Sequence, residues 1–165
     1  MPGIALEGFK QAGMKVGDVG ITENLMDARS LFLTPNSTTV YNFAELDVKD
    51  GPIVMEVPPG VLGPIDDAFF RWVADVGVTG ADQGKGGKYL VMHNSYKGEI
   101  PEGYFVVKTP SFRNLVLYFI PSLRAITALV RQELEARRLR VGEISEGILI
   151  VARGTDITLR RFASG

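Results

Sequence analysis

Short runs of alternating apolar and polar residues, rich in β-branched and aromatic side chains, follow one another through the middle of the chain. They occupy residues 38–46, 53–57, 88–93, 103–109 and 114–120, and turn residues separate them. β-Branched and aromatic residues favour strands, and short strands at intervals of roughly 10 residues are typical of an antiparallel sandwich or barrel. The pattern therefore predicts a mainly β fold built on an antiparallel β-sandwich.

The first two runs, 38–46 and 53–57, are separated by the turn residues Asp50, Gly51 and Pro52. Apolar side chains occur on both faces of the first run, so we expect both of its faces to be at least partly covered. Two β runs that flank a turn commonly pair with each other. The sequence therefore predicts an antiparallel pair between these runs.

An aromatic run at 68–76 contains the only tryptophan and fits either a buried strand or successive helical turns; we favour the strand. Its side chains Phe69, Phe70 and Trp72 are expected in the core, because aromatic residues dominate sandwich interiors. Residues 77–87 hold five of the 19 glycines of the chain and are expected to form a long, flexible hairpin loop.

Three segments differ in character along the chain. Residues 1–30 form an N-terminal helical or irregular segment, because glycines interrupt its helical spacing. Residues 31–120 hold the predicted strands and are assigned to the β-sandwich domain. Residues 121–165 form an arginine-rich tail. This organisation gives one main domain with two appendages.

The tail changes composition abruptly. All seven lysines lie at or before Lys108, whereas eight arginines and no lysine occur from Arg124 onward. The tail is expected to contain an amphipathic helix capped by Ser122 and then β runs at 148–152 and 157–161. Two interpretations stay open: a genuine tail of mixed α and β structure, or a tail translated in a shifted reading frame.

Composition narrows the classes of function. The formal net charge is −1, whereas proteins that neutralise phosphates usually carry a basic excess, so nucleic acid is not an expected partner. The absence of cysteine excludes disulfides, thiolate nucleophiles and cysteine-ligated metals. No window approaches the roughly 20 apolar residues of a membrane span, and no signal-peptide pattern occurs at the start. The chain as written is expected in the cytoplasm.

An ordered set of short motifs runs through the predicted sandwich. The set consists of TPNSTTVY at 34–41, LD at 46–47, DGP at 50–52, EVPP at 56–59, IDD at 65–67, RWV at 71–73 with Asp75 and Gly77, GKGGKYL at 84–90 and PEGYF at 101–105. In this order the motifs, which cover roughly residues 25–119, resemble the bacterial domain-of-unknown-function family DUF1254. The resemblance implies an immunoglobulin-like β-sandwich.

The resemblance also implies a longer protein, with more chain before the sandwich and a second, jelly-roll-like domain after it. The resemblance further implies that many full-length relatives are exported, whereas this chain as written shows no signal-peptide pattern. Here the arginine-rich tail replaces the continuation expected after residue 119. We therefore expect a truncated or fragmentary member whose partner is a second β domain or another copy of the chain.

Two motifs with catalytic or nucleotide-binding associations are incomplete. The glycine-rich run 80–86 resembles a phosphate-binding loop, but its spacing is one residue short and Gly86 stands where a hydroxyl is needed. His93 is the only histidine, and Ser95 lies nearby across a turn. Without a nucleophile-elbow motif, His93 is expected to end a strand with an exposed ring.

Several polar residues in these motifs are candidates for a ligand site: Asn36, Thr39, Tyr41, Asp66, Asp67, Arg71 and Lys88. Asp66 and Asp67 follow a Gly-Pro pair, so the favoured interpretation is a turn whose carboxylate accepts backbone N–H groups and pairs with Arg71. Asn36 is likewise interpreted first as a turn former. No metal ligands are assigned, and no cofactor is identified.

These observations support two hypotheses. The first is a β-sandwich module without catalytic activity, which binds or packs against another domain. The alternative is a hydrolase-like enzyme with a polar or divalent-cation site near Asp66 and Asp67, because carboxylates ligate hard cations and act in acid–base chemistry.

Overall fold

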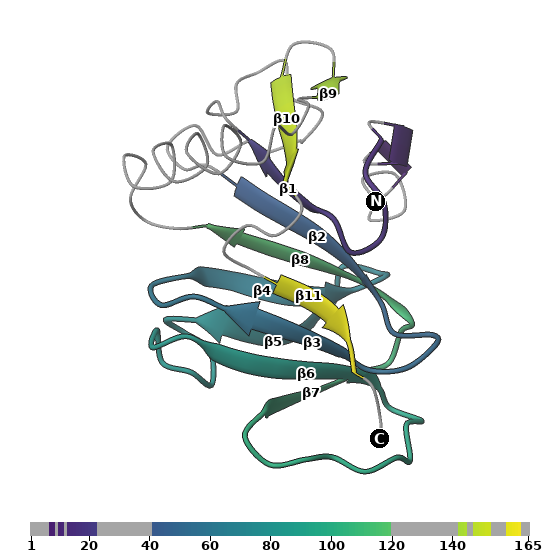
Figure 1. Ribbon diagram of the computed structural model, residues 1–165, viewed down its shortest axis with the longest axis vertical. Coiled ribbons are helices and arrows are strands. Elements are labelled where there is room, and N and C mark those ends of the chain that lie inside the picture. Colours follow the sequence, from purple (N-terminus) through teal and green to yellow (C-terminus); the bar gives the residue numbers. More distant parts are fainter. Residues whose placement is uncertain are drawn as a thin grey trace.

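The computed structural model describes residues 7–8, 10–11, 13–22, 41–119, 142–144, 147–152 and 158–162. Within these residues the regular structure is almost entirely β and forms two sheets (Figure 1). The strands are β1 (Val19–Thr22), β2 (Tyr41–Asp47), β3 (Ile53–Val57), β4 (Leu62–Asp67), β5 (Trp72–Gly77), β6 (Gly87–His93), β7 (Phe105–Thr109), β8 (Arg113–Phe119), β9 (Gly142–Ile144), β10 (Gly147–Ala152) and β11 (Thr158–Arg161). The mainly β class predicted from the sequence is confirmed.

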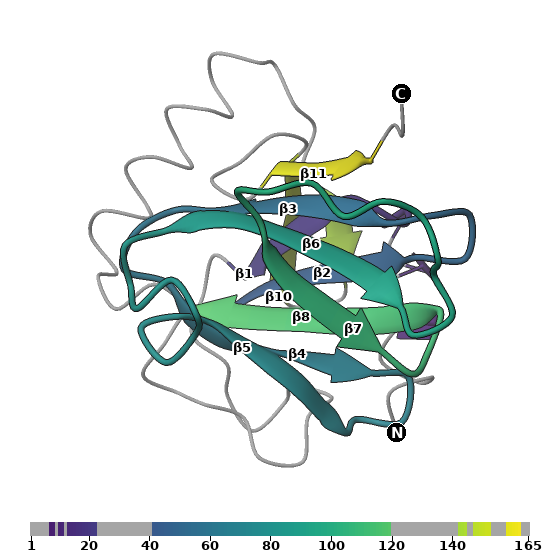
Figure 2. The same cartoon turned by 90° about the horizontal axis from the view of Figure 1, so that it is seen from below.

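The two sheets form an immunoglobulin-like β-sandwich. The large sheet has the strand order β5-β4-β8-β2-β1-β10-β9, and its neighbouring strands run antiparallel. The small sheet has the order β11-β3-β6-β7. Figures 1 and 2 show the two layers from directions 90° apart. Strands β5 and β7 end their sheets on the same side of the sandwich.

The core lies between the sheets and follows the two-residue period of the strands. Leu46, Ile65 and Val116 enter it from the large sheet, and Met55 and Val91 enter it from the small sheet. Each of these five side chains is fully buried. Burying such a side chain stabilises the fold by about 1.5–3 kcal/mol relative to leaving it exposed.

The pairing of β6 with β7 is parallel, which differs from the predicted all-antiparallel arrangement. A parallel neighbour requires a connection that carries the chain back along the sheet. Residues 94–104 make this return, and their Tyr96 and Tyr104 pack on a second apolar cluster that includes Leu90 and Met92. The cluster lies on the outer face of the small sheet, so the long connection also covers that face.

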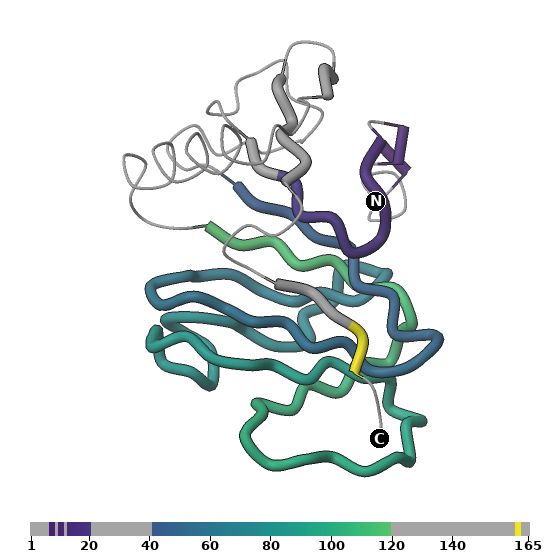
Figure 3. The backbone as a smooth tube through the Cα atoms, viewed as in Figure 1, coloured from purple at the N-terminus to yellow at the C-terminus, as the bar shows by residue number. Residues whose placement is uncertain are grey.

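The predicted pair between runs 38–46 and 53–57 is wrong. Their strands β2 and β3 lie in different sheets, and β2 pairs with β1 and β8. Figure 3 shows the connection between them passing around one end of the sandwich. Val48 in this connection is buried in the core, and its N–H donates to the Phe112 carbonyl at 2.8 Å. Burial of this loop residue directs the chain from one sheet to the other.

The predicted strand at 68–76 is only partly correct. Its first four residues form the turn between β4 and β5, and the strand itself starts at Trp72. Strand β4 was missed because Pro64 and the Asp66-Asp67 pair are typical of turns. The register shift between Ile65 and Asp66 allows these residues to lie in a strand with an irregular ladder.

Other expectations are confirmed. Strand β3 spans the predicted residues 53–57, and the two β runs expected in the tail correspond to β10 and β11. Strand β10 pairs with β1 and strand β11 pairs with β3. Residues 7–8 and 10–11 are helical. The helix expected after Ser122 lies outside the described residues.

The described residues include no helix long and apolar enough to cross a membrane.

Candidate functional site

The turn between β4 and β5, residues 68–71, is organised together with the first β5 residue, Trp72, by one buried carboxylate. Asp67 Oδ1 accepts the backbone N–H groups of Phe69 at 2.8 Å and Arg71 at 3.0 Å. Its Oδ2 accepts Arg71 Nε at 2.7 Å. The backbone closes the same turn, because Asp67 N–H donates to the Arg71 carbonyl and Phe70 N–H donates to the Asp67 carbonyl. The predicted turn with an Asp–Arg pair is confirmed at Asp67.

The two neighbouring carboxyl groups, Asp66 and Asp67, have opposite electrostatics. Burial by itself raises the pKa of Asp67, but hydrogen bonds from Arg71 and from the turn amides outweigh burial and hold the pKa below its usual range. Burial raises the pKa of Asp66, and the negative charges of Asp67 and Asp75 raise it further. Asp66 therefore resists ionisation, whereas the neighbouring Asp67 ionises readily.

The aromatic side chains of this turn point away from the core, so their predicted burial is wrong. Phe69 is 73% exposed, Phe70 is 52% exposed and Trp72 is 67% exposed. Phe69 and Phe70 lie in the turn, outside the strand ladder, and Trp72 is the first residue of the edge strand β5. Phe70 has a φ of 64°, a left-handed conformation that is rare for a bulky residue. We call residues 68–72 the aromatic turn.

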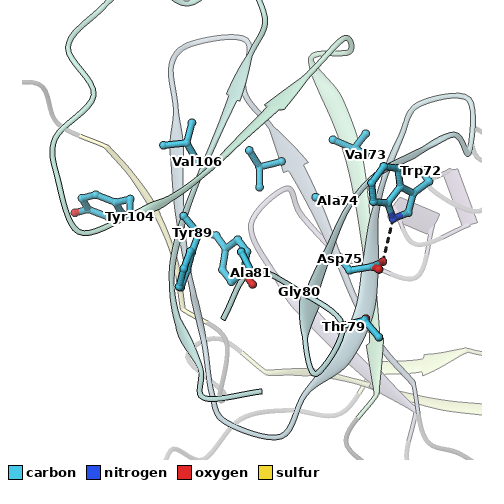
Figure 4. Close-up of a pocket in the computed structure, with 12 residues that line it drawn as sticks. Trp72, Val73, Ala74, Asp75, Thr79, Gly80, Ala81, Tyr89, Tyr104 and Val106 are labelled. Atoms are coloured by element: carbon cyan, nitrogen blue, oxygen red, sulfur yellow. Dashed lines mark hydrogen bonds between the residues drawn. The ribbon is translucent and has the colours of Figure 1, made fainter. Parts of the chain in front are cut away.

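A cleft of about 430 Å³ adjoins the aromatic turn, between strand β5 of the large sheet and strand β7 of the small sheet (Figure 4). Trp72 and Asp75 line it from β5, and Tyr104 and Val106 line it from the β7 side. The indole Nε1–H of Trp72 donates to Asp75 Oδ1 at 2.9 Å, as the dashed line in Figure 4 shows. This hydrogen bond holds the indole ring at one end of the cleft.

The glycine-rich loop after β5 is closed by its own carboxylate. Asp82 is buried; its Oδ1 accepts the N–H of Gly77 at 2.8 Å and its Oδ2 accepts the N–H of Gly86 at 2.9 Å. The Tyr89 hydroxyl donates to the same carboxylate. These backbone amides thus bind an anion from within the chain, which disfavours the phosphate-loop interpretation. The loop also joins β5 to β6 of the other sheet, so the predicted hairpin is wrong.

Tyr89 at the base of this loop is held in its neutral form. Burial raises the pKa of the Tyr89 phenol to about 12, and its hydrogen bond to Asp82 acts in the same direction. The ring also packs against Phe105, with centroids 5.2 Å apart. Tyr89 therefore links the glycine-rich loop to the wall of the cleft.

His93 and Ser95 form a local turn. The Ser95 N–H donates to His93 Nδ1 at 3.1 Å, and the Ser95 hydroxyl lies 2.7 Å from the same nitrogen. His93 Nε2 lies 3.3 Å from the Pro110 carbonyl oxygen, and the ring stacks on Phe112. His93 ends β6 as predicted, with a half-buried ring. Its described partners include no carboxylate to complete a catalytic triad.

The structure brings together only part of the predicted polar site. Asp66, Asp67 and Arg71 meet at the aromatic turn. Tyr41 lies on β2, where its ring contacts Phe43 and Phe119. Lys88 is exposed on β6 in the small sheet. Asn36 and Thr39 lie outside the described residues.

Sequence reasoning missed the role of Asp82, Asp75 and the exposed Trp72. Asp82 lies in the glycine-rich run. An acidic residue among glycines can signal a carboxylate that is bound by the backbone N–H groups of its own loop. Within the described part of the chain, no group of three or more His, Asp or Glu side chains could hold a metal ion.

Comparisons with known proteins concern the fold. The family model described as "Protein of unknown function (DUF1254)" matches residues 16–121. None of the curated proteins matches the chain. The chain is similar to the crystal structure of the VPA0106 protein from Vibrio parahaemolyticus, with a TM-score of 0.54 and 16% sequence identity. The match covers 88% of this chain and 34% of that protein, so the chain spans about a third of its length.

Proposed function

This chain belongs to the DUF1254 family of proteins of unknown function, and on that premise we propose that it is a β-sandwich module that packs against another β domain. Catalysis is not part of this role. The module presents the aromatic turn and the adjacent cleft as its contact surface. The exposure of the aromatic turn is the observation that carries the proposal.

Three large aromatic side chains, Phe69, Phe70 and Trp72, are more than half exposed on four consecutive positions of one turn. Contiguous exposed apolar surface marks interaction sites, and aromatic residues and arginine are enriched at the centres of interfaces. Arg71 belongs to the same group, because its guanidinium carbon lies 5.4 Å from the centroid of the Phe69 ring. The composition of the turn is therefore that of a binding hot spot.

The turn is also rigid in a way that favours binding. The Asp67 carboxylate accepts three hydrogen bonds, from two backbone N–H groups and from Arg71 Nε, and it forms an ion pair with a terminal nitrogen of Arg71. A surface that is already ordered loses little conformational entropy when a partner docks on it. The strained φ of Phe70 is maintained by the same network. These contacts present the aromatic side chains in one geometry.

The length of the solved relative agrees with a packing role. Since the match covers 34% of the Vibrio protein, most of that protein lies outside the region shared with this chain. Domains within one protein commonly pack through interfaces of about 600–1,500 Å². We favour a second β domain as the partner class, because the DUF1254 resemblance implies such a domain after the sandwich.

The hydrolase alternative has less support from the described residues. Asp67 already binds Arg71 and two amides, so it has little capacity left for a cation. The Ser95–His93 pair is a local turn between residues two apart. A catalytic triad requires a third group that orients the histidine, and the Pro110 carbonyl oxygen is the contact at Nε2.

The test is complex formation with the part of the Vibrio protein that lies outside the match. We expect a one-to-one complex on size-exclusion chromatography and a blue shift of the emission of Trp72, the single tryptophan in this chain. Phe70→Ser is expected to weaken the complex at least tenfold, because truncating a hot-spot aromatic costs more than about 1.4 kcal/mol. Ile100→Ser is the matched control, because Ile100 is an exposed apolar residue outside the aromatic turn.

Absence of a complex with the wild-type chain would contradict the packing role. Equal weakening by Phe70→Ser and Ile100→Ser would show that general surface hydrophobicity, and not the aromatic turn, drives association.

A further inference from the structure

One side of the sandwich is formed by two sheet edges. Strand β5 ends the large sheet and strand β7 ends the small sheet, and no described strand pairs with their outer sides. The cleft lies between these two edges and is lined by residues of both strands. Unpaired backbone N–H and C=O groups on an edge strand form a template for another strand. The cleft is therefore bounded by backbone hydrogen-bonding groups as well as by side chains.

The direction of these groups on β7 follows from its pairing with β6. The Thr109 carbonyl accepts the N–H of Asn94, which follows β6, at 2.9 Å, so the backbone polar groups of Thr109 face β6. N–H and C=O groups alternate between the two sides of a strand from one residue to the next. The polar groups of Phe105 and Val107 then also face β6. Those of Val106 and Lys108 face the open edge.

Strand β7 is a better template than β5. The ladder between β4 and β5 is irregular at Ile65 and Asp66, whereas β7 keeps an unbroken register with β6 over all five of its residues. Irregularities such as bulges protect edge strands against pairing. Strand β5 carries Asp75, which lines the cleft. Val106 on β7 is 43% exposed and lines the same cleft.

We propose that an extended segment of the partner domain adds to the free edge of β7 as a fifth strand of the small sheet. This inference rests on the proposed packing role and specifies its geometry. Main-chain hydrogen bonds to Val106 and Lys108 supply the pairing, as in other cases of strand addition. Alternate side chains of the added strand enter the cleft.

Charge defines the chemistry of the added strand. Asp75 lines the cleft and places a carboxylate in its wall. Inward-facing positions of the partner are therefore apolar or basic. Lys108 is exposed on the outer face of β7, which it shares with Val106, because Val107 between them faces the core. Outward-facing positions of the partner opposite Lys108 are acidic.

The test uses the full chain and the synthetic peptide acetyl-Ser-Val-Glu-Lys-Glu-Val-Ser-amide, whose inward positions are Val, Lys and Val. Binding is followed by the emission of Trp72, which lines the cleft, and by amide shifts of β7 in two-dimensional NMR spectra. We expect saturable binding to the wild-type chain. A peptide in which Lys and Glu are exchanged is expected to bind at least tenfold more weakly.

The edge hydrogen bonds can be removed specifically in two ways, by a proline in β7 or by N-methylation of the peptide. Val106→Pro deletes the N–H that faces the open edge and leaves the bonds to β6, and proline is tolerated at such edge positions. Val106→Thr is the matched control because it retains this N–H. We expect at least tenfold weaker peptide binding for Val106→Pro and unchanged binding for Val106→Thr. An N-methylated peptide, blocked at the amides that face β7, makes the same test without altering the protein.

Equal affinity of Val106→Pro and Val106→Thr, full affinity of the N-methylated peptide, or no binding at millimolar peptide would each overturn the proposal. Self-association of the chain that Val106→Pro abolishes would also overturn it, because a second copy would then be the occupant. The packing role is tested separately: if Phe70→Ser disrupts the complex with the Vibrio fragment and Val106→Pro does not, packing stands and strand addition fails.

Discussion

Arg71 contacts a single carboxylate oxygen of Asp67 through two guanidinium nitrogens: Nε donates a hydrogen bond to Oδ2 at 2.7 Å, and a terminal nitrogen forms an ion pair with the same oxygen at 2.7 Å. The other oxygen of Asp67 accepts the N–H groups of Phe69 and Arg71. The buried carboxylate of Asp67 therefore takes part both in the ion pair with Arg71 and in the hydrogen bonds that close the turn. The Asp67 side chain is 1% exposed and that of Arg71 is 65% exposed. Substitution of Asp67 should therefore lower the free energy of unfolding more than substitution of Arg71.

Asp67→Asn is expected to lower the free energy of unfolding by about 1–3 kcal/mol, because charge-assisted hydrogen bonds to a buried group are lost. Arg71→Gln, which alters the exposed partner, is expected to cost less than about 1 kcal/mol. Urea unfolding of both variants measures the difference. Equal losses would show that the ion pair matters more than the turn cap.

The acid stability of the chain follows from the same group. The pKa of Asp67 is lowered by folding, so its contribution is present above the unfolded pKa of 3.8 and is lost as pH falls through the lower folded pKa. The difference between the wild-type chain and Asp67→Asn should therefore shrink as pH falls below about 4. A difference that stays constant down to pH 2 would contradict this assignment.

Asp66→Asn is expected to stabilise the protein at neutral pH. The pKa of Asp66 is raised by burial and by Asp67 and Asp75, so its favourable contribution is complete below pH 3.8 and is lost as pH rises through the folded pKa. Removing the charge should increase the melting temperature at pH 7 and have little effect near pH 3. Melting curves across this range test it, with Glu102→Gln at an exposed position as the control. Destabilisation at pH 7 would contradict the prediction.

Tyr89→Phe is expected to remove an alkaline transition. A phenol whose pKa is raised to about 12 contributes stability below the unfolded pKa of 10.0, and this stability is lost as pH rises through about 12. At neutral pH the free energy of unfolding of the variant should be about 1–2 kcal/mol lower, because the buried Asp82 carboxylate loses one hydrogen-bond donor. Ultraviolet titration of the five tyrosines should show one group that ionises last and is absent from the variant.

Gly77→Ala is expected to be far more destabilising than Gly103→Ala. Both glycines have positive φ values, +80° and +86°, but a Cβ at Gly77 would lie 1.7 Å from the Val61 carbonyl oxygen, whereas nothing lies within 4 Å at Gly103. Conformational strain alone should cost about 1 kcal/mol at Gly103. The added clash should cost more than about 3 kcal/mol at Gly77. Comparable losses in urea unfolding would contradict the close approach of Gly77 to Val61.

Trp72 provides a direct check on the exposed aromatic turn. It is the only tryptophan and is 67% exposed, so its fluorescence should be quenched by acrylamide nearly as efficiently as that of a tryptophan in a short peptide. Asp75→Asn should alter the emission by weakening the hydrogen bond from the indole Nε1–H. A protected tryptophan in the isolated chain would contradict the exposed turn.

The sequence alone determined the β class, the β3 run and the later runs that became β6, β7 and β8. These features depend on local information, since two-residue alternation and turn residues act within a few positions. The pairing of Asp67 with Arg71 was equally local, because both residues belong to one turn. The DUF1254 resemblance rested on the order of motifs along the chain and is confirmed by the match to residues 16–121.

Only the tertiary structure decided which sheet each strand joins and which aromatic residues face the solvent. Strand β2 joined β8, which lies 66 or more positions away along the chain at each pair, instead of the nearby β3. The burial of Val48, the outward course of the turn at Trp72 and the capture of glycine amides by Asp82 likewise depend on distant contacts or loop geometry. Alternation along a strand defines its two faces, but the partner that covers each face is chosen by the packing of the whole sandwich.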